Sequence, residues 1–218
     1  MYEILVRNKE GFLSGLGVTV QICLFAWAIG LVLGTLLGYL ISKNRVVSGV
    51  TEVLSYVVSS IPVLVFLFWL HYPAQRLLDV SVDPLITTIF LLSLLNLLAV
   101  ADIIKTGVHN VPKQYAEVGL LCGLSKRRIF RAIQLPLIGR HVLPPLLMAQ
   151  VNVLHMSLFA SLISVPEIFR VSQRIVALEL RPVEIYSALG LLFLVVSLPM
   201  IGMATMLKRR FKKTLDER

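Results

Sequence analysis

Hydrophobic residues in this chain gather into five long stretches that are separated by shorter polar segments. A helix needs ~20 mostly apolar residues to cross the hydrocarbon core of a bilayer, and each stretch is about that long. The stretches cover roughly residues 15–41, 50–71, 85–104, 141–165 and 185–207. The pattern predicts an all-α integral membrane protein with about five transmembrane helices, which form a single transmembrane domain over residues 1–218.

Two of these spans carry signals of close packing or bending. Small residues recur every four positions in the first span and therefore share one helix face, where another helix can approach closely. They are Ala26, Gly30, Gly34 and Gly38. In the second span, Ser59-Ser60-Ile61-Pro62 interrupts the apolar run, and the proline predicts a kink there.

Composition supports a membrane protein. Hydrophobic residues make up 57% of the chain and charged residues only 15%, which is too apolar for a soluble domain. The net charge of +9 would suggest nucleic acid as a partner of a soluble protein. Here the basic residues lie in loops beside apolar spans, so they are better explained by orientation in membrane lipid, and we expect no nucleic-acid partner.

The basic residues also predict the orientation. Two follow the first span, seven lie in the long loop before the fourth span and six lie in the C-terminal tail, fifteen in all on one side. The other side has six. The positive-inside rule therefore places the long loop and the C-terminus in the cytoplasm and the N-terminus outside.

The long loop, roughly residues 105–140, is patterned more strongly than a connector needs to be. Apolar residues recur at helical spacing on both sides of Gly123, which can break a helix in a left-handed conformation. Ser125 can cap a following helix, and Pro136 is expected to end it. The loop is therefore predicted to form two short helices with a sharp bend on a basic face.

This loop resembles the cytoplasmic "EAA" loop of ABC importer permeases, in which a Glu, two small residues and a Gly precede a Leu-Pro pair at fixed spacing. Val118 and Gly119 stand where two alanines are usual. The resemblance implies the type I importer fold and a coupling helix that docks on a separate ATPase. The residues implied in that coupling are Glu117, Val118, Gly119, Gly123, Leu124, Leu135 and Pro136.

Further segments resemble the polar amino-acid permeases of the histidine, glutamine and arginine uptake type. They include Gly15-Leu16 with Thr19-Val20-Gln21, Ala101–Gly107 and Val165-Pro166-Glu167. Two positions depart from that pattern: Ser-Ser-Ile-Pro replaces Arg-Gly-Thr-Pro in the second span, and His155 replaces a lysine. From the sequence, Glu167 is assigned to an external gate or docking surface rather than to the core.

The resemblance also implies the assembly. The partners would be two ATP-binding subunits, a second permease that is identical or homologous, and an external solute-binding protein. The cargo would be a small polar solute such as a polar amino acid. ATP and Mg would bind the partner ATPase, so no cofactor is expected in this chain, which would lie in a bacterial cytoplasmic (inner) membrane.

Polar side chains within the third and fourth spans are candidates for a solute path, because such residues usually face a bundle interior or a water-filled path. They are Asn96, Gln150, Asn152, His155 and Ser157. The alternative is that they form hydrogen bonds between helices, worth about 0.6–2 kcal/mol per contact.

Motifs for catalysis are missing from the sequence. It has no Gly-x-x-x-x-Gly-Lys-Ser/Thr loop for nucleotide, no Gly-x-Ser-x-Gly and no His-Glu-x-x-His, and its four histidines lack local metal-ligand spacing. We therefore expect neither an enzyme nor a metal site. A self-sufficient secondary transporter or channel is the alternative function, but it would have no use for a docking loop, and no inverted repeat is visible.

Overall fold

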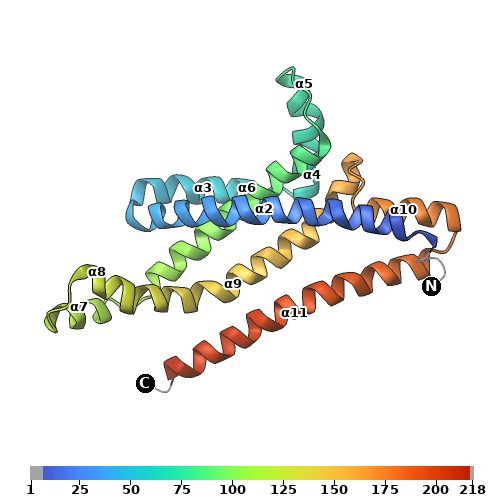
Figure 1. Ribbon diagram of the computed structural model, residues 1–218. Helices are drawn as coiled ribbons and strands as arrows, with labels where there is room; N and C mark the ends of the chain where they lie inside the picture. The colour runs from blue at the N-terminus through green and yellow to red at the C-terminus, as the bar shows by residue number, and fades with distance from the viewer. Residues whose placement is uncertain (1–6, 217–218) are drawn as a thin grey trace.

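The computed structural model describes residues 7–216, and every regular element in that range is a helix (Figure 1). This confirms the all-α membrane fold. The helices are α2 (Lys9–Lys43), α3 (Arg45–Ser60), α4 (Val63–Trp69), η1 (Leu70–Ala74), α5 (Gln75–Leu77), α6 (Pro84–His109), α7 (Gln114–Leu121), α8 (Lys126–Ile129), η2 (Phe130–Gln134), α9 (Leu135–Met156), η3 (Ser157–Ile163), α10 (Ile168–Glu179) and α11 (Pro182–Asp216).

Four helical segments are long and apolar enough to cross a membrane, and a fifth is reached if one bent pair counts as a single span. The four are Lys9–Lys43, Pro84–His109, Lys126–Ile163 and Pro182–Phe211. Each is longer than the apolar stretch predicted for it. The helices extend into the polar residues that flank the apolar stretches, because polar side chains do not prevent helix formation.

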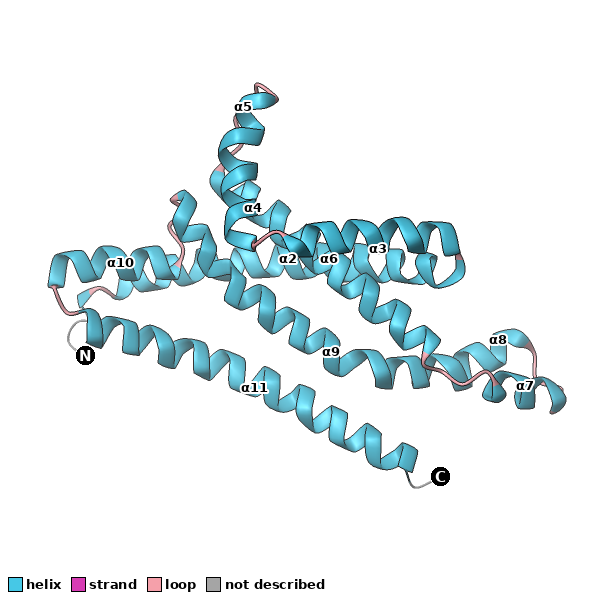
Figure 2. Cartoon of the chain, turned by 180° about the vertical axis from the view of Figure 1, so that it is seen from behind, coloured by secondary structure: helices cyan, strands magenta, loops and turns pink. Residues whose placement is uncertain are grey.

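The second predicted span is two helices rather than one kinked helix. Arg45–Ser60 and Val63–Leu77 meet at 93°. Ile61 between them is extended, with φ −92° and ψ 125°, because the ring of Pro62 disfavours the helical region for the residue before it. The segment from α4 to α5 therefore projects away from the bundle, as both views show (Figures 1 and 2).

The small-residue stripe of α2 lies in the contact with α6. A Cβ added to Gly34 would lie 2.7 Å from the Leu97 carbonyl oxygen, and one added to Gly38 would lie 2.8 Å from the Ala101 carbonyl oxygen. Because the obstructing atoms are backbone, these positions admit no side chain without moving the helices apart.

Helices α2, α6 and α9 form the centre of the bundle, and α11 lies along α9 (Figure 1). The largest apolar cluster joins α2, α4, α6, α9 and η3 around Ile22, Leu91 and Val153. The α7 and α8 helices and the end of α11 lie at one end of the molecule, whereas α10 and the beginning of α2 lie at the other (Figures 1 and 2).

Candidate functional site

The turn between α7 and α8 is a Schellman motif closed by Gly123. The Gly123 N–H donates to the Leu120 carbonyl (2.9 Å) and the Leu124 N–H donates to the Gly119 carbonyl (3.0 Å), which is the hydrogen-bond pair of that motif. Gly123 has φ +75°, as the sequence predicted, in the left-handed region that suits glycine. The bend is therefore held by the backbone itself.

Gly119 brings the two short helices together. A Cβ at this position would lie 2.9 Å from Cγ1 of Ile129, a side chain only 3% exposed. A Cβ there would force the Ile129 side chain or α8 itself to shift. The requirement for a small residue two positions after Glu117 thus has a packing cause.

The second short helix does not end at Pro136. The chain stays helical from Lys126 through the π-helical turn η2 into α9, with Pro136 in the first turn of α9. The predicted stop is wrong because a proline is tolerated in a first turn, and a wide π turn immediately before it accommodates the interruption. Ser125 occupies the N-cap position of α8 in an extended conformation, but its side chain makes no capping hydrogen bond.

The α7–α8 turn, residues 114–134, presents apolar and basic side chains together. Leu121 is 88% exposed and Val118 is 57% exposed. Around them lie the exposed bases Lys126, Arg127, Arg128 and Arg131. The turn lies at the joined ends of α6 and α9 (Figure 1). An exposed apolar patch rimmed by charge, on a rigid turn between two spans, has the properties of a docking surface.

Asn96 and Gln150, two of the predicted path residues, are instead bonded to each other. The Asn96 Nδ2 donates to Gln150 Oε1 (3.0 Å) and to the Ala26 carbonyl (3.0 Å). The Gln150 Nε2 donates to Asn96 Oδ1 (3.3 Å) and to the Leu146 carbonyl (3.2 Å). All four amide N–H groups are therefore used within the bundle. A role toward solute stays a prediction, and it would require this pair to open.

Asn152 and His155 lie on a different face of α9. Together with Pro145 and Met148 they form a stripe of exposed residues at spacings of three, four and three, which we call the open stripe. His155 Nε2 lies 3.0 Å from the Ser197 hydroxyl of α11. Ser157 is separate from the stripe, because it is fully buried and donates to the Leu154 carbonyl (2.7 Å). The structure thus divides the predicted path residues among three environments.

Comparison with known proteins identifies the family of this chain. The profile of the family described as binding-protein-dependent transport system inner membrane component matches residues 30–213. The chain belongs to that family. It is the permease subunit of an ABC importer and a multi-pass inner-membrane protein, which confirms the resemblance found in the α7–α8 turn.

Two relatives illustrate the similarity. The glutamine transport system permease protein GlnP of Escherichia coli (strain K12) is 29% identical over 203 residues, covering 92% of each chain. The nopaline transport system permease protein NocM of Agrobacterium fabrum (strain C58) is 23% identical over 205 residues, covering 89% of this chain and 85% of that one.

Solved structures show the same fold. The crystal structure of an amino acid ABC transporter with histidines has a TM-score of 0.82 at 21% identity, and the match covers 94% of this permease and 96% of that chain. The inward-facing MetNI methionine ABC transporter has a TM-score of 0.64 at 16% identity, with 97% of each chain covered.

Glu167 lies in the core of the permease, so its assignment from sequence to an external gate or docking surface is wrong. Its side chain is fully buried and accepts from the N–H groups of Phe169 and Arg170 (both 2.8 Å), so it caps α10. The neighbouring Ile168 N–H donates to Thr19 Oγ1 of α2 (3.1 Å). Burial raises the pKa of the Glu167 carboxyl to about 7, and the two backbone donors oppose that rise. A glutamate is a weak capping signal in a sequence, which explains why the role was missed.

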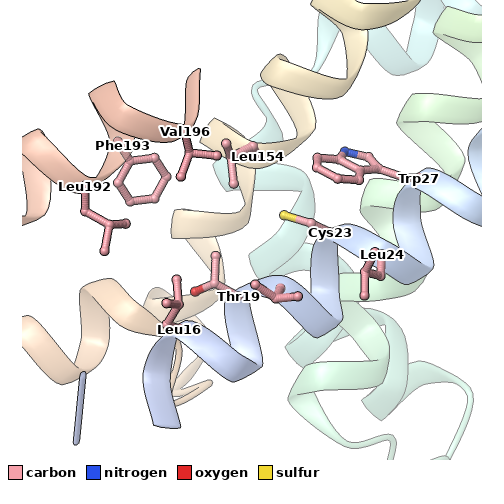
Figure 3. Close-up of a pocket in the computed structure, with 10 residues that line it drawn as sticks. Leu16, Thr19, Cys23, Leu24, Trp27, Leu154, Leu192, Phe193 and Val196 are labelled. Carbon is pink, nitrogen blue, oxygen red and sulfur yellow. The ribbon is translucent and has the colours of Figure 1, made fainter. Parts of the chain in front are cut away.

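An apolar cavity of about 100 Å³ separates α2, α9 and α11 of the permease (Figure 3). Trp27, Leu154 and Phe193 point into it from the three helices. Its lining has no exposed polar surface, so it offers no partner to a polar solute. This cavity is therefore no candidate for the path of a polar solute.

Proposed function

We propose that this permease carries a polar amino acid and draws its energy from separate ATP-binding subunits that dock on the α7–α8 turn. ATP and Mg²⁺ would bind those subunits, and this chain would hold no cofactor. The observation that carries the proposal is the α7–α8 turn itself: its backbone is locked by Gly123, its helices are packed at Gly119, and its apolar residues face outward.

The α7–α8 turn is connected so that its movement would be passed on to α6 and α9. It joins α6 directly to α9 through short, ordered connections, and those two helices carry the amide pair and the Gly107–Val142 contact. A partner that moves the turn would therefore move α6 and α9 together. Glu117 is exposed on α7, where it can meet a basic group of the partner. Val118 belongs to the exposed apolar patch, whereas the other coupling residues shape the turn or the start of α9: Gly119, Gly123, Leu124, Leu135 and Pro136.

The open stripe supports the proposed solute path. Exposed polar groups within a membrane-spanning helix are costly against lipid, so Asn152 and His155 are expected to face water or protein. A second permease, identical or homologous, would cover this face and enclose a path between the two subunits. The amide of Asn152 and the imidazole of His155 can bind a neutral polar amino acid by hydrogen bonds.

Asn96, Gln150 and Ser157 would hold the wall of the solute path in place. In this conformation they fix the wall of the path, and opening of the amide pair would expose two donors to a solute. The glutamine and nopaline systems among the relatives are consistent with a polar amino-acid cargo.

The two ends of the molecule support an orientation in the membrane. The basic α7–α8 turn and the Lys208-Arg209-Arg210 segment lie at the same end (Figure 1). We assign that end to the cytoplasm, where the ATP-binding subunits are, and we assign the N-terminus and α10 to the outside. An external solute-binding protein would deliver the amino acid to the α10 end.

Co-expression with an ATP-binding subunit of the same importer tests the proposal. Purification through a tag on the permease should recover two ATP-binding subunits for two permeases, and uptake into proteoliposomes should require ATP. The alternative, a secondary transporter, predicts that the permease alone transports with an ion gradient and without ATP. That result would overturn the proposed function.

A further inference from the structure

The exposed residues of α6 form a stripe of their own near its α7 end. Ala99, Asp102, Thr106 and His109 are all exposed and recur at spacings of three, four and three, so they share one helix face. We call this face the α6 stripe. Three of its four members are polar, although α6 is one of the helices apolar enough to cross a membrane.

This stripe is turned away from α2. Val100 and Ile104 are buried on the opposite side of α6, where they meet Gly34 and Gly38 of α2. The open stripe of α9 likewise lies opposite Gln150, whose carbonyl accepts from the Trp27 indole of α2 (3.1 Å). Both stripes therefore belong to the same face of the α6–α9 layer.

The two stripes are held at a fixed relation by direct contacts. The amide pair of Asn96 and Gln150 joins α6 to α9 near the middle of α6. Closer to the α7 end, a Cβ on Gly107 would lie 2.2 Å from Cγ2 of Val142. The α6 stripe and the open stripe thus form one surface on the side of these two helices away from α2, with His155 and Asn152 on α9 and Asp102 on α6.

Asp102 is the charged member of this surface. It lies six residues beyond Asn96, which places it about 9 Å closer to the α7 end of the helix. Within residues 7–216 the structure shows no ion pair or hydrogen bond to its carboxylate. The other charge within this span, Lys105, lies on a neighbouring face and pairs with Glu52 of α3 (3.3 Å).

An ionised side chain in a membrane span is costly unless it faces water or a compensating charge, and it marks a site by default. An amino acid that descends along Asn152 and His155 carries one positive group, its ammonium. Resting on the proposed function, we propose that Asp102 is a solute-binding residue on the α7 side of the path and receives the ammonium group of the transported amino acid.

The test uses the complete importer with its ATP-binding subunits. The probe is the amino acid that the wild type takes up most strongly from an equimolar mixture of the twenty standard amino acids. Its dissociation constant is then measured by equilibrium dialysis on the nanodisc complex without binding protein, beside that of its N-acetyl derivative, which lacks the ammonium charge.

We expect the wild type to bind the free amino acid at least tenfold more tightly than the N-acetyl derivative. Asp102→Asn should weaken binding of the free amino acid by about tenfold and leave the derivative unchanged, since the charge pair is then already missing. Asp102→Glu should keep most of the preference. Glu52→Gln, which removes a carboxylate from outside this surface, should change neither constant.

Other outcomes separate the two proposals. If the wild type with active ATPase takes up no amino acid, the proposed function fails. If it takes up one but shows no preference for the free amine, or if Asp102→Asn weakens both ligands equally, the role of Asp102 is wrong and the proposed function stands. The wild-type preference and the Asp102→Glu measurement decide the matter even if Asp102→Asn does not fold.

Discussion

The side-chain amides of Asn96 and Gln150 bond to each other twice, across the contact between α6 and α9. Each amide uses its remaining N–H on a backbone carbonyl of a helix, one on α2 and one on α9. The pair therefore fastens the two helices that carry the α7–α8 turn to the centre of the bundle.

A double-mutant cycle on this pair should show coupling. Asn96→Leu and Gln150→Leu each leave a buried amide without its partner, whereas the double variant removes both. We expect a coupling free energy of about 0.6–1.7 kcal/mol, the range of hydrogen bonds between membrane helices, from unfolding in mild detergent. Strictly additive effects would show that the two amides do not depend on each other.

Gly123→Ala should weaken the α7–α8 turn, because the left-handed conformation costs an L-residue about 1–2 kcal/mol. We expect less ATP-binding subunit to co-purify with the variant, while insertion into the membrane is unchanged. Gly49→Ala is the matched control: a Cβ there meets no atom within 4 Å, and alanine favours its helix. Equal co-purification of the ATP-binding subunit with both variants would show that Gly123 is not needed for coupling.

We expect the free energy of unfolding to depend on pH through Glu167. Its folded pKa of about 7 exceeds the ordinary value of 4.5, so the folded state favours the protonated carboxyl. The resulting stabilisation is fully present below about pH 4.5 and is lost as the pH rises to about 7, a change on the order of 3 kcal/mol.

The comparison with Glu167→Gln isolates this contribution. The difference in melting temperature between wild type and Glu167→Gln should shift against the wild type between pH 5 and pH 8, because glutamine does not titrate. A difference that stays constant over this range would mean that the carboxyl is not destabilised by burial.

The two native cysteines report the orientation. Cys122 is exposed in the α7–α8 turn, whereas Cys23 is buried in α2. An impermeant maleimide added to intact cells should leave Cys122 unlabelled and should label it after lysis. Arg7→Cys should be labelled in intact cells. Labelling of Cys122 from outside would reverse the proposed topology and remove the turn from the side of ATP.

Sequence alone predicts the parts of this fold that depend on neighbouring residues. Apolar length identifies the spans, four-residue spacing places Gly30, Gly34 and Gly38 on one face, and a lone glycine between two helical patterns marks the left-handed turn at Gly123. These features follow from helix geometry and backbone sterics, which act over a few residues.

The features that sequence misses depend on tertiary contacts. The residues around Pro62 do not say whether the chain resumes in line or at 93°, and those around Pro136 do not say whether the proline ends a helix or begins one. Asn96 and Gln150 bond to each other, whereas Asn152 is exposed, and this difference can be predicted only when the relative position of α6 and α9 is known. Local spacing carries none of that information.

Cross-linking from Cys122 tests the central claim most directly, that the α7–α8 turn is the docking surface for the ATP-binding subunit. A photoreactive maleimide is attached to Cys122 in the purified importer and activated by light, with Cys122→Ser as the control. We expect a permease–ATPase product, which the control lacks. An intact, active complex in which Cys122 is labelled but cross-links only within the permease, or not at all, would contradict it.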